Sequence, residues 1–147
     1  MMADGGIKDI LVANEIVGAK KIARLVSLCK RADIMVCVDD KDNVEQIDRA
    51  ARAVGVRPRV LIEVDVGMGR AGVQPGAATV ELASQISRFE SIRFAGLQTW
   101  ESHTLKITDE AEKKRQVLAA LLQLNDTAER IRGAGMPVDI LSCGGTG

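Results

Sequence analysis

The sequence predicts an α/β protein in which about five parallel strands alternate with helices. Two observations support this prediction. Short, nearly continuous apolar runs alternate along the 147 residues with stretches whose apolar side chains recur at helical spacing. Such continuous runs are typical of parallel strands that are buried on both faces. Residues of unusual chemistry also follow the runs directly, and the carboxyl ends of parallel strands are where α/β proteins carry their sites.

The individual elements follow from these patterns. Five apolar runs predict strands at 9–13, 33–38, 59–66, 92–97 and 138–141. Amphipathic stretches predict helices at 17–31, 42–54, about 77–88 and about 109–133. Gly55 is expected as a helix C-cap, and Thr108 or Asp109 as an N-cap.

Two architectures fit this βαβαβαβαβ order, an open doubly wound sheet and a closed eight-stranded barrel. A closed barrel typically needs about 250 residues, so a barrel with five strands would be only part of one. The doubly wound alternative would suit a nucleotide-binding protein. However, no Gly-x-Gly-x-x-Gly opens the first predicted helix, which disfavours that alternative.

Composition excludes several classes of protein. Apolar residues make up 46% and charged residues 27%, as in an ordinary globular domain. The 20 basic and 20 acidic side chains balance, and only 2% of residues are aromatic, so a nucleic-acid-binding surface is not expected. No stretch approaches the roughly 20 apolar residues of a membrane span, and no secretory signal is visible.

The cysteines indicate a reducing compartment. Cys29, Cys37 and Cys143 are odd in number and widely spaced, so a disulfide framework is not expected, and a cytoplasmic location is. The chain has one histidine and no Cys-x-x-Cys pair, and therefore no metal site is predicted. Cys29 and Cys37 are interpreted as small buried hydrophobic residues.

The last six residues, Ser142 to Gly147, form a glycine-rich segment directly after the last predicted strand. Glycines there allow backbone N–H groups to turn toward an anion, and Thr146 adds a hydroxyl donor. The alternative is a tight turn that requires positive φ angles. Composition alone leaves a phosphate-binding loop and a plain turn equally open.

Two other strand ends carry candidate residues. Arg70 lies among glycines after the third strand and offers a fork of donors for a phenolate or carboxylate, although it also suits an exposed loop. Trp100 and His103 follow the fourth strand. A wide ring there suits stacking on a planar cofactor, but both residues also suit structural roles.

These segments resemble a known family. Residues 64–73, 94–97 and 142–147 look like D-threonine aldolase, which with D-serine dehydratase belongs to the pyridoxal-phosphate enzymes built on the alanine racemase N-terminal barrel. Residues 9–15 look like the second strand of that barrel. The resemblance implies that residues 1–147 form one incomplete domain of this kind, a partial TIM (β/α)8 barrel from the second to the sixth strand.

The resemblance also implies roles for residues. Arg70 matches the arginine that faces the phenolic oxygen of the cofactor and the carboxylate region of the substrate. Trp100 falls where relatives usually place a tyrosine or histidine against the cofactor ring. His103 matches a histidine often seen in the aldolases and is the candidate catalytic residue. The expected contacts of pyridoxal phosphate are Arg70, Trp100, Ser142, Gly144, Gly145, Thr146 and Gly147.

The departures from the family limit the expected activity. The family's Schiff-base lysine lies on the first barrel strand, and its divalent metal ligands lie in a C-terminal β domain; neither is found here. Lys8 lies at the wrong end of its strand. We therefore expect a catalytically deficient part of an enzyme that cleaves D-threonine or a related D-β-hydroxy amino acid to glycine and an aldehyde. The alternatives are a non-enzymatic barrel that binds pyridoxal phosphate or phosphate, and a partial barrel that self-associates through open sheet edges.

Overall fold

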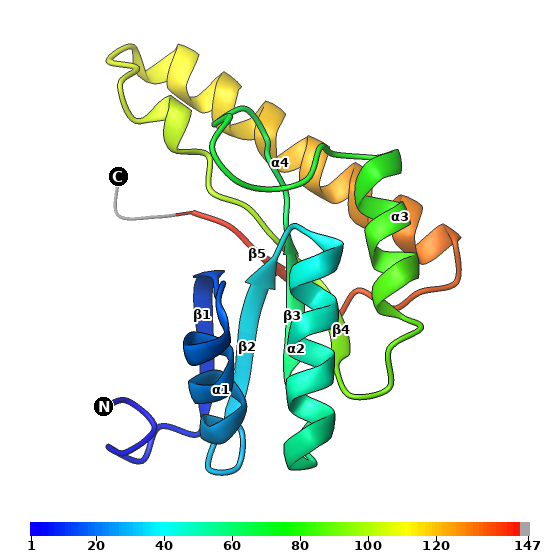
Figure 1. The fold of residues 1–147 in the computed structure, drawn as a ribbon. Coiled ribbons are helices and arrows are strands. Elements are labelled where there is room, and N and C mark those ends of the chain that lie inside the picture. The colour runs from blue at the N-terminus through cyan, green and yellow to red at the C-terminus, as the bar shows by residue number, and fades with distance from the viewer. Residues whose placement is uncertain (145–147) are drawn as a thin grey trace.

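Five parallel strands form one curled sheet in a computed structural model that describes residues 1–144, and the helices lie against one of its faces (Figure 1). The strands are β1 (Asp9–Glu15), β2 (Asp33–Val38), β3 (Arg59–Glu63), β4 (Arg93–Gln98) and β5 (Ile140–Ser142). The helices are α1 (Ala19–Leu28), α2 (Lys41–Val54), α3 (Ala77–Ile86) and α4 (Glu110–Gly133), with a 3-10 turn, η1 (Ser102–Thr104).

The order of strands in the sheet decides between the two architectures. The strands pair in the order β1-β2-β3-β4-β5, and all four pairs are parallel. A doubly wound sheet reverses its strand order at a switch point, and this sheet does not. The prediction of a partial TIM barrel is therefore confirmed.

The two faces of the sheet are packed differently. Side chains that alternate along β2 and β3 pack against the helices and form the main core. This core includes Ile34, Val36, Val38, Val60 and Ile62 from the sheet, and Ile22, Val44, Ile47, Leu82 and Ile131 from the helices. The opposite, concave face corresponds to a barrel interior. Its small apolar cluster of Met35, Leu61 and Ala95, with Leu11 and Ile140 packed against it, contains no helix residue.

Most predicted boundaries hold. β2 spans the predicted residues, Gly55 ends α2 in the left-handed region at φ 68°, and Asp109 caps α4 by accepting a hydrogen bond from the Glu112 amide. The third strand is shorter than predicted and ends at Glu63. Beyond it, the Asp65 amide donates to the Val73 carbonyl and the Val73 amide donates to the Glu63 carbonyl, so the chain closes its own loop instead of extending the strand.

Gly96 fixes how closely β4 and β5 approach each other. A Cβ at this position would overlap the Ile140 carbonyl oxygen, and only glycine avoids that overlap. No helix within residues 1–144 is both long enough and apolar enough to cross a membrane.

Candidate functional site

The carboxyl edge of the sheet brings the predicted site segments together. The glycine-rich loop of residues 64–73 follows β3, the segment 99–104 follows β4, and the chain continues from β5 at the same edge (Figure 1). Thr99 joins these segments. Its Oγ1 donates a 2.7 Å hydrogen bond to the Val64 carbonyl, and its amide donates a 2.9 Å bond to the Ser142 carbonyl.

Asp65 shapes the glycine-rich loop from inside. Its carboxylate accepts hydrogen bonds from the Gly67 amide at 3.1 Å and from the Gly69 amide at 3.0 Å. Partial burial alone would raise the pKa of Asp65. The bonds from the amides of Gly69, Gly67 and Met68, together with the nearby His103, outweigh it and hold this pKa below its usual value. The loop is thus folded around an ionised carboxylate at neutral pH.

A second carboxylate attaches the loop to β2. Asp39, directly after β2, accepts a 3.0 Å hydrogen bond from the Gly72 amide. Gly72 has φ +103°, and a Cβ there would lie 2.8 Å from the backbone nitrogen of Asp65. Glycine is therefore required at this position both by backbone conformation and by space.

Arg70 projects from this loop onto Trp100. The guanidinium carbon lies 5.5 Å from the centroid of the indole ring, which is within cation–π range. Arg70 is exposed and Trp100 is half-buried. The structure thus brings together two of the residues singled out in the sequence, from segments that follow different strands.

His103 lies in η1 with its ring against the loop. A Cβ added at Gly67 would lie 3.2 Å from the Cε1 atom of His103, so the imidazole occupies the space that this glycine leaves open. Its Nδ1 atom is buried and has no hydrogen-bond partner within residues 1–144. Buried polar atoms in folded proteins are usually hydrogen-bonded, and this nitrogen is an exception.

The terminal segment is only partly described. The Gly144 amide donates a 3.2 Å hydrogen bond to Oε2 of Glu101, and Gly144 has φ +89°. Gly145, Thr146 and Gly147, which the sequence assigns to a phosphate contact, lie outside the described residues.

Sequence reasoning missed two residues on the concave face, Glu63 and Gln98. They are paired in the register of β3 and β4, and their residues are 9% and 7% exposed. Burial raises the pKa of Glu63 to about 7, and the negative charges of Glu15 and Asp39 add to this effect, whereas a contact with Cys37 and the charge of Arg70 oppose it. The available signal was a glutamate two residues after the inward-facing Leu61, directly after the apolar residues 60–62.

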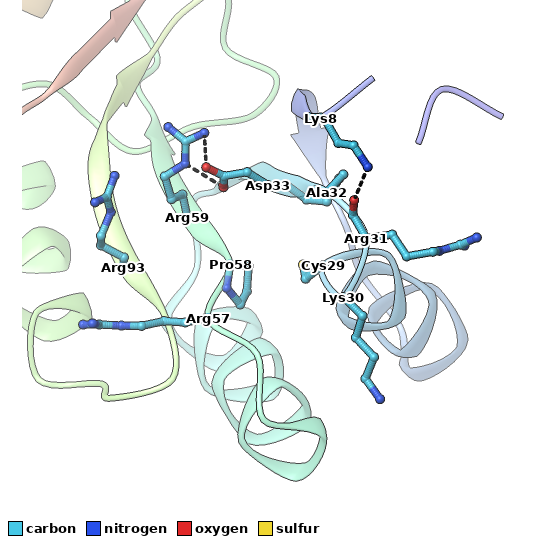
Figure 2. Close-up of a pocket in the computed structure, with 11 residues that line it drawn as sticks. Lys8, Cys29, Lys30, Arg31, Ala32, Asp33, Arg57, Pro58, Arg59 and Arg93 are labelled. Atoms are coloured by element: carbon cyan, nitrogen blue, oxygen red, sulfur yellow. Dashed lines mark hydrogen bonds and ion pairs between the residues drawn. The ribbon is translucent and has the colours of Figure 1, made fainter. Parts of the chain in front are cut away.

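A pocket of ≈ 720 Å³ lies at the other, amino-terminal edge of the sheet (Figure 2). Its lining is strongly basic, but the cations do not converge. Arg59 is bound to Asp33 and Asp9 at 2.8 and 2.6 Å, while Lys30, Arg31 and Arg57 point in different directions (Figure 2). An anion site requires donors aimed at one point, and this pocket does not provide it.

Comparison with known proteins places the chain in a family. The family described as alanine racemase, N-terminal domain, matches residues 2–147. The chain belongs to this family. It is 34% identical over 146 residues to 3-hydroxy-D-aspartate aldolase of Paracoccus denitrificans (strain Pd 1222), and 37% identical over 142 residues to D-threonine aldolase of Arthrobacter sp.. These alignments cover 99% and 97% of this chain, but 38% of each relative.

A solved structure gives the same picture. The crystal structure of D-threonine aldolase from Filomicrobium marinum superposes with a TM-score of 0.93 at 33% identity, over 97% of this chain and 38% of that one. The chain therefore spans little more than a third of the relatives that it matches. The sequence-based resemblance to this group of enzymes is confirmed at the level of the family and the fold.

Family membership implies pyridoxal phosphate as cofactor, and the carboxyl edge suits such a group. A planar anionic cofactor needs a cation, an aromatic surface and backbone that it can approach closely. Arg70, Trp100 and the surrounding glycines supply these, and the orphaned Nδ1 of His103 adds an unused polar atom. Within residues 1–144, no three histidine, cysteine, aspartate or glutamate side chains are grouped so that they could hold a metal ion.

Proposed function

We propose that residues 1–147 form the part of the barrel of a pyridoxal-phosphate-dependent aldolase that runs from the second to the sixth strand. Its substrates would be D-threonine or related D-β-hydroxy amino acids, cleaved to glycine and an aldehyde. One observation carries this proposal: Arg70 lies over Trp100 at the carboxyl edge, within a loop held by Asp65. The names of the relatives, D-threonine aldolase and 3-hydroxy-D-aspartate aldolase, support the reaction class.

In this proposal each residue at the edge binds or orients. Arg70 binds the phenolate of the cofactor and the carboxylate of the substrate, because its fork of donors suits both. Trp100 stacks on the cofactor ring. The phosphate is bound by the terminal segment, through Ser142, Gly144, Gly145, Thr146 and Gly147. When bound, pyridoxal phosphate supplies the electron sink for cleavage of the carbon–carbon bond.

Proton transfer at this edge needs a titratable group, and indole has none in the accessible pH range. We propose His103 for this role, since its ring packs against Gly67 and its Nδ1 atom has no partner in the described chain. Asp65 would then act as a positioning residue, because its charge is held close to His103 by the loop amides.

We also propose that the polypeptide of residues 1–147 is catalytically deficient by itself. None of the five strands contains a lysine, and Lys8 lies next to the start of β1, at the edge opposite Arg70. The cofactor pocket would be partly present, but the nucleophile that holds the cofactor covalently would not. We expect the divalent metal ligands that the resemblance implies to lie outside these residues.

Titration of the purified chain with pyridoxal phosphate, followed by absorbance, tests the pocket. Borohydride reduction and mass spectrometry then test for a lysine adduct, and an aldehyde assay with D-threonine tests turnover. We expect a saturable spectral change without aldehyde release, and the Arg70→Ala variant serves as the control. Efficient turnover would contradict the deficiency, and the absence of any saturable change would contradict the pocket.

Self-association is a separate proposal that rests on the edge strands. β1 and β5 are the outer strands of the sheet, and Ile7, Val17 and Leu141 are exposed beside them. Unpaired edges and exposed apolar side chains favour pairing with a second copy. Sedimentation is expected to show a dimer or larger species, and a monomer over the whole concentration range would contradict this. The free thiols of Cys29, Cys37 and Cys143 support a cytoplasmic location.

A further inference from the structure

The outward face of α4 carries an apolar strip that is exposed to solvent. Leu118 and Leu122 lie four residues apart, so they are neighbours on one face of the helix, and they are 50% and 67% exposed. They belong to a shallow groove of ≈ 420 Å³ that follows the helix and is lined by Ala111, Lys114, Arg115, Leu118, Ala119 and Leu122. Contiguous exposed apolar side chains indicate an interaction surface.

The core of the chain does not account for this strip. α4 packs into the main core through buried residues that include Ala120 and Leu124. A helix turns by about 100° per residue, so Leu122 lies close to the opposite side of α4 from both of them. None of residues 110–119 is buried, and this first half of α4 extends past the carboxyl edge of the sheet (Figure 1). The helix therefore has two apolar faces, of which the described chain buries one.

Opposite charges flank the strip at its two ends. Arg115 precedes the leucines and Asp126 follows them, and both side chains are exposed. The two residues are eleven positions apart, which is close to three helical turns, so they lie on the same flank of the strip. Within their own helix Arg115 pairs with Glu112, and Asp126 pairs with Arg130. Exposed ion pairs contribute little to stability, so both charges can exchange partners at a small cost.

An antiparallel pair of α4 helices matches the apolar strip and its charges together. With a two-fold axis at the level of Ala120, Leu118 of one copy meets Leu122 of the other, because each lies two residues from the axis. Arg115 of one copy meets Asp126 of the other for the same reason, at five and six residues from the axis. A parallel pair would place like charges opposite each other at both ends, which is unfavourable. The strip is therefore self-complementary in the antiparallel direction.

We infer that the outward face of α4 binds the α4 helix of a second copy of this chain in antiparallel orientation. The inference goes beyond the proposed function, because the strip shares no residue with the proposed cofactor site. It also names a surface that is separate from the edge strands β1 and β5. Two leucines per copy bury much less area than a standard interface, so we expect a weak dimer with a Kd of about 0.1 mM.

Sedimentation equilibrium of the purified chain, between about 10 µM and about 1 mM, tests this inference. We expect Leu122→Glu to raise the Kd of the dimer at least about tenfold, because it places a carboxylate against a leucine twice in each dimer. Gln123→Glu is the matched control. It adds the same charge to the same helix at an exposed position about 100° around from Leu122, and it should leave the Kd unchanged. Urea unfolding checks that each variant is folded, and Leu118→Glu provides the same test if Leu122→Glu is not.

Charge exchange tests the orientation of the pair. Arg115→Asp and Asp126→Arg should each weaken the dimer about tenfold, because like charges then meet at both ends. The double variant restores opposite charges and should recover the original Kd. Failure of the double variant to recover would overturn the antiparallel pairing. A monomer over the whole concentration range would overturn the inference, and so would an unchanged Kd in Leu122→Glu, which would assign self-association to the edge strands.

Discussion

At the amino-terminal edge of the sheet charged side chains form ion pairs with one another. At the carboxyl edge, by contrast, several polar atoms have no hydrogen-bond partner within residues 1–144. Arg59 is bound by both Asp9 and Asp33, and these pairs join the starts of β1, β2 and β3. Figure 2 shows the pair with Asp33. At the carboxyl edge, polar atoms of Glu63 and His103 lack partners in the described chain. The proposed functional edge is therefore distinguished by its unpartnered polar atoms and not by the size of a pocket.

The largest expected effect comes from separating β5 from the carboxyl edge. In Gly96→Ala the new Cβ would overlap the Ile140 carbonyl oxygen, so β4 and β5 must move apart. We expect a loss of about 3 kcal/mol in the free energy of unfolding, measured with urea. Gly133→Ala is the control, because nothing lies within 4 Å of its Cβ in α4, and it should be neutral or slightly stabilising. Equal stability of the two variants would show that β5 is not anchored as described.

Removing one arginine from each edge tests this difference between the two edges. Arg70→Ala removes the exposed cation over Trp100, and we expect affinity for pyridoxal phosphate to fall by about 10- to 100-fold with little change in stability. Arg93→Ala removes a half-exposed cation from the amino-terminal pocket and should leave this affinity unchanged. Absorbance titration measures both. A similar loss in the two variants would mean that general charge, and not the site, attracts the cofactor.

Glu63 predicts an unusual dependence of stability on pH. Burial raises its pKa from 4.5 to about 7, so between these values the folded chain holds a proton that the unfolded chain has released. This contribution to stability is therefore lost as the pH rises from about 4.5 through 7. Glu63→Gln should gain about 2 kcal/mol relative to the unaltered chain between pH 4.5 and 8 in urea unfolding. Parallel pH profiles for the two chains would contradict the buried ionisation.

The smallest effect is expected at the amino-terminal edge. Arg59→Met keeps an apolar stem but removes both ion pairs, and since Asp9 and Asp33 are exposed, each pair contributes modestly. We expect a loss of about 1 kcal/mol in thermal or urea unfolding and unchanged binding of pyridoxal phosphate. A change in the affinity for pyridoxal phosphate would contradict a purely structural role for Arg59 at this edge.

Local patterns predicted the elements well but gave no information on the register between strands. Gly55 and Asp109 act as caps because capping depends on neighbours along the chain. Gln98 could not be placed in the same way. Strict alternation from the inward-facing Ala95 would direct it toward the helices, but the register of β3 and β4 shifts by one residue between Val60 and Leu61. Such an irregularity depends on the neighbouring strand, so no pattern in one segment reveals it.

The candidate site was predicted in part for the same reason. Arg70 and Trp100 were singled out because both follow strand ends, and parallel strands bring their ends to one edge. Their contact depends on how Asp65 folds the loop, which sequence spacing does not specify. The assignments of Gly145, Thr146 and Gly147 remain predictions, because these residues lie outside the described chain.

Thr99 has a consequence for how this edge moves. The Thr99 hydroxyl donates to the Val64 carbonyl after β3, and the Thr99 amide donates to the Ser142 carbonyl of β5, so the ends of both strands are held to β4. Thr99 itself is buried. Opening any one of the three strand ends then requires breaking bonds to the others, so the three should exchange their amide hydrogens as a single cooperative unit. The glycine-rich loop would be carried on this unit, and a ligand that stiffens the loop would slow exchange as far away as Ser142.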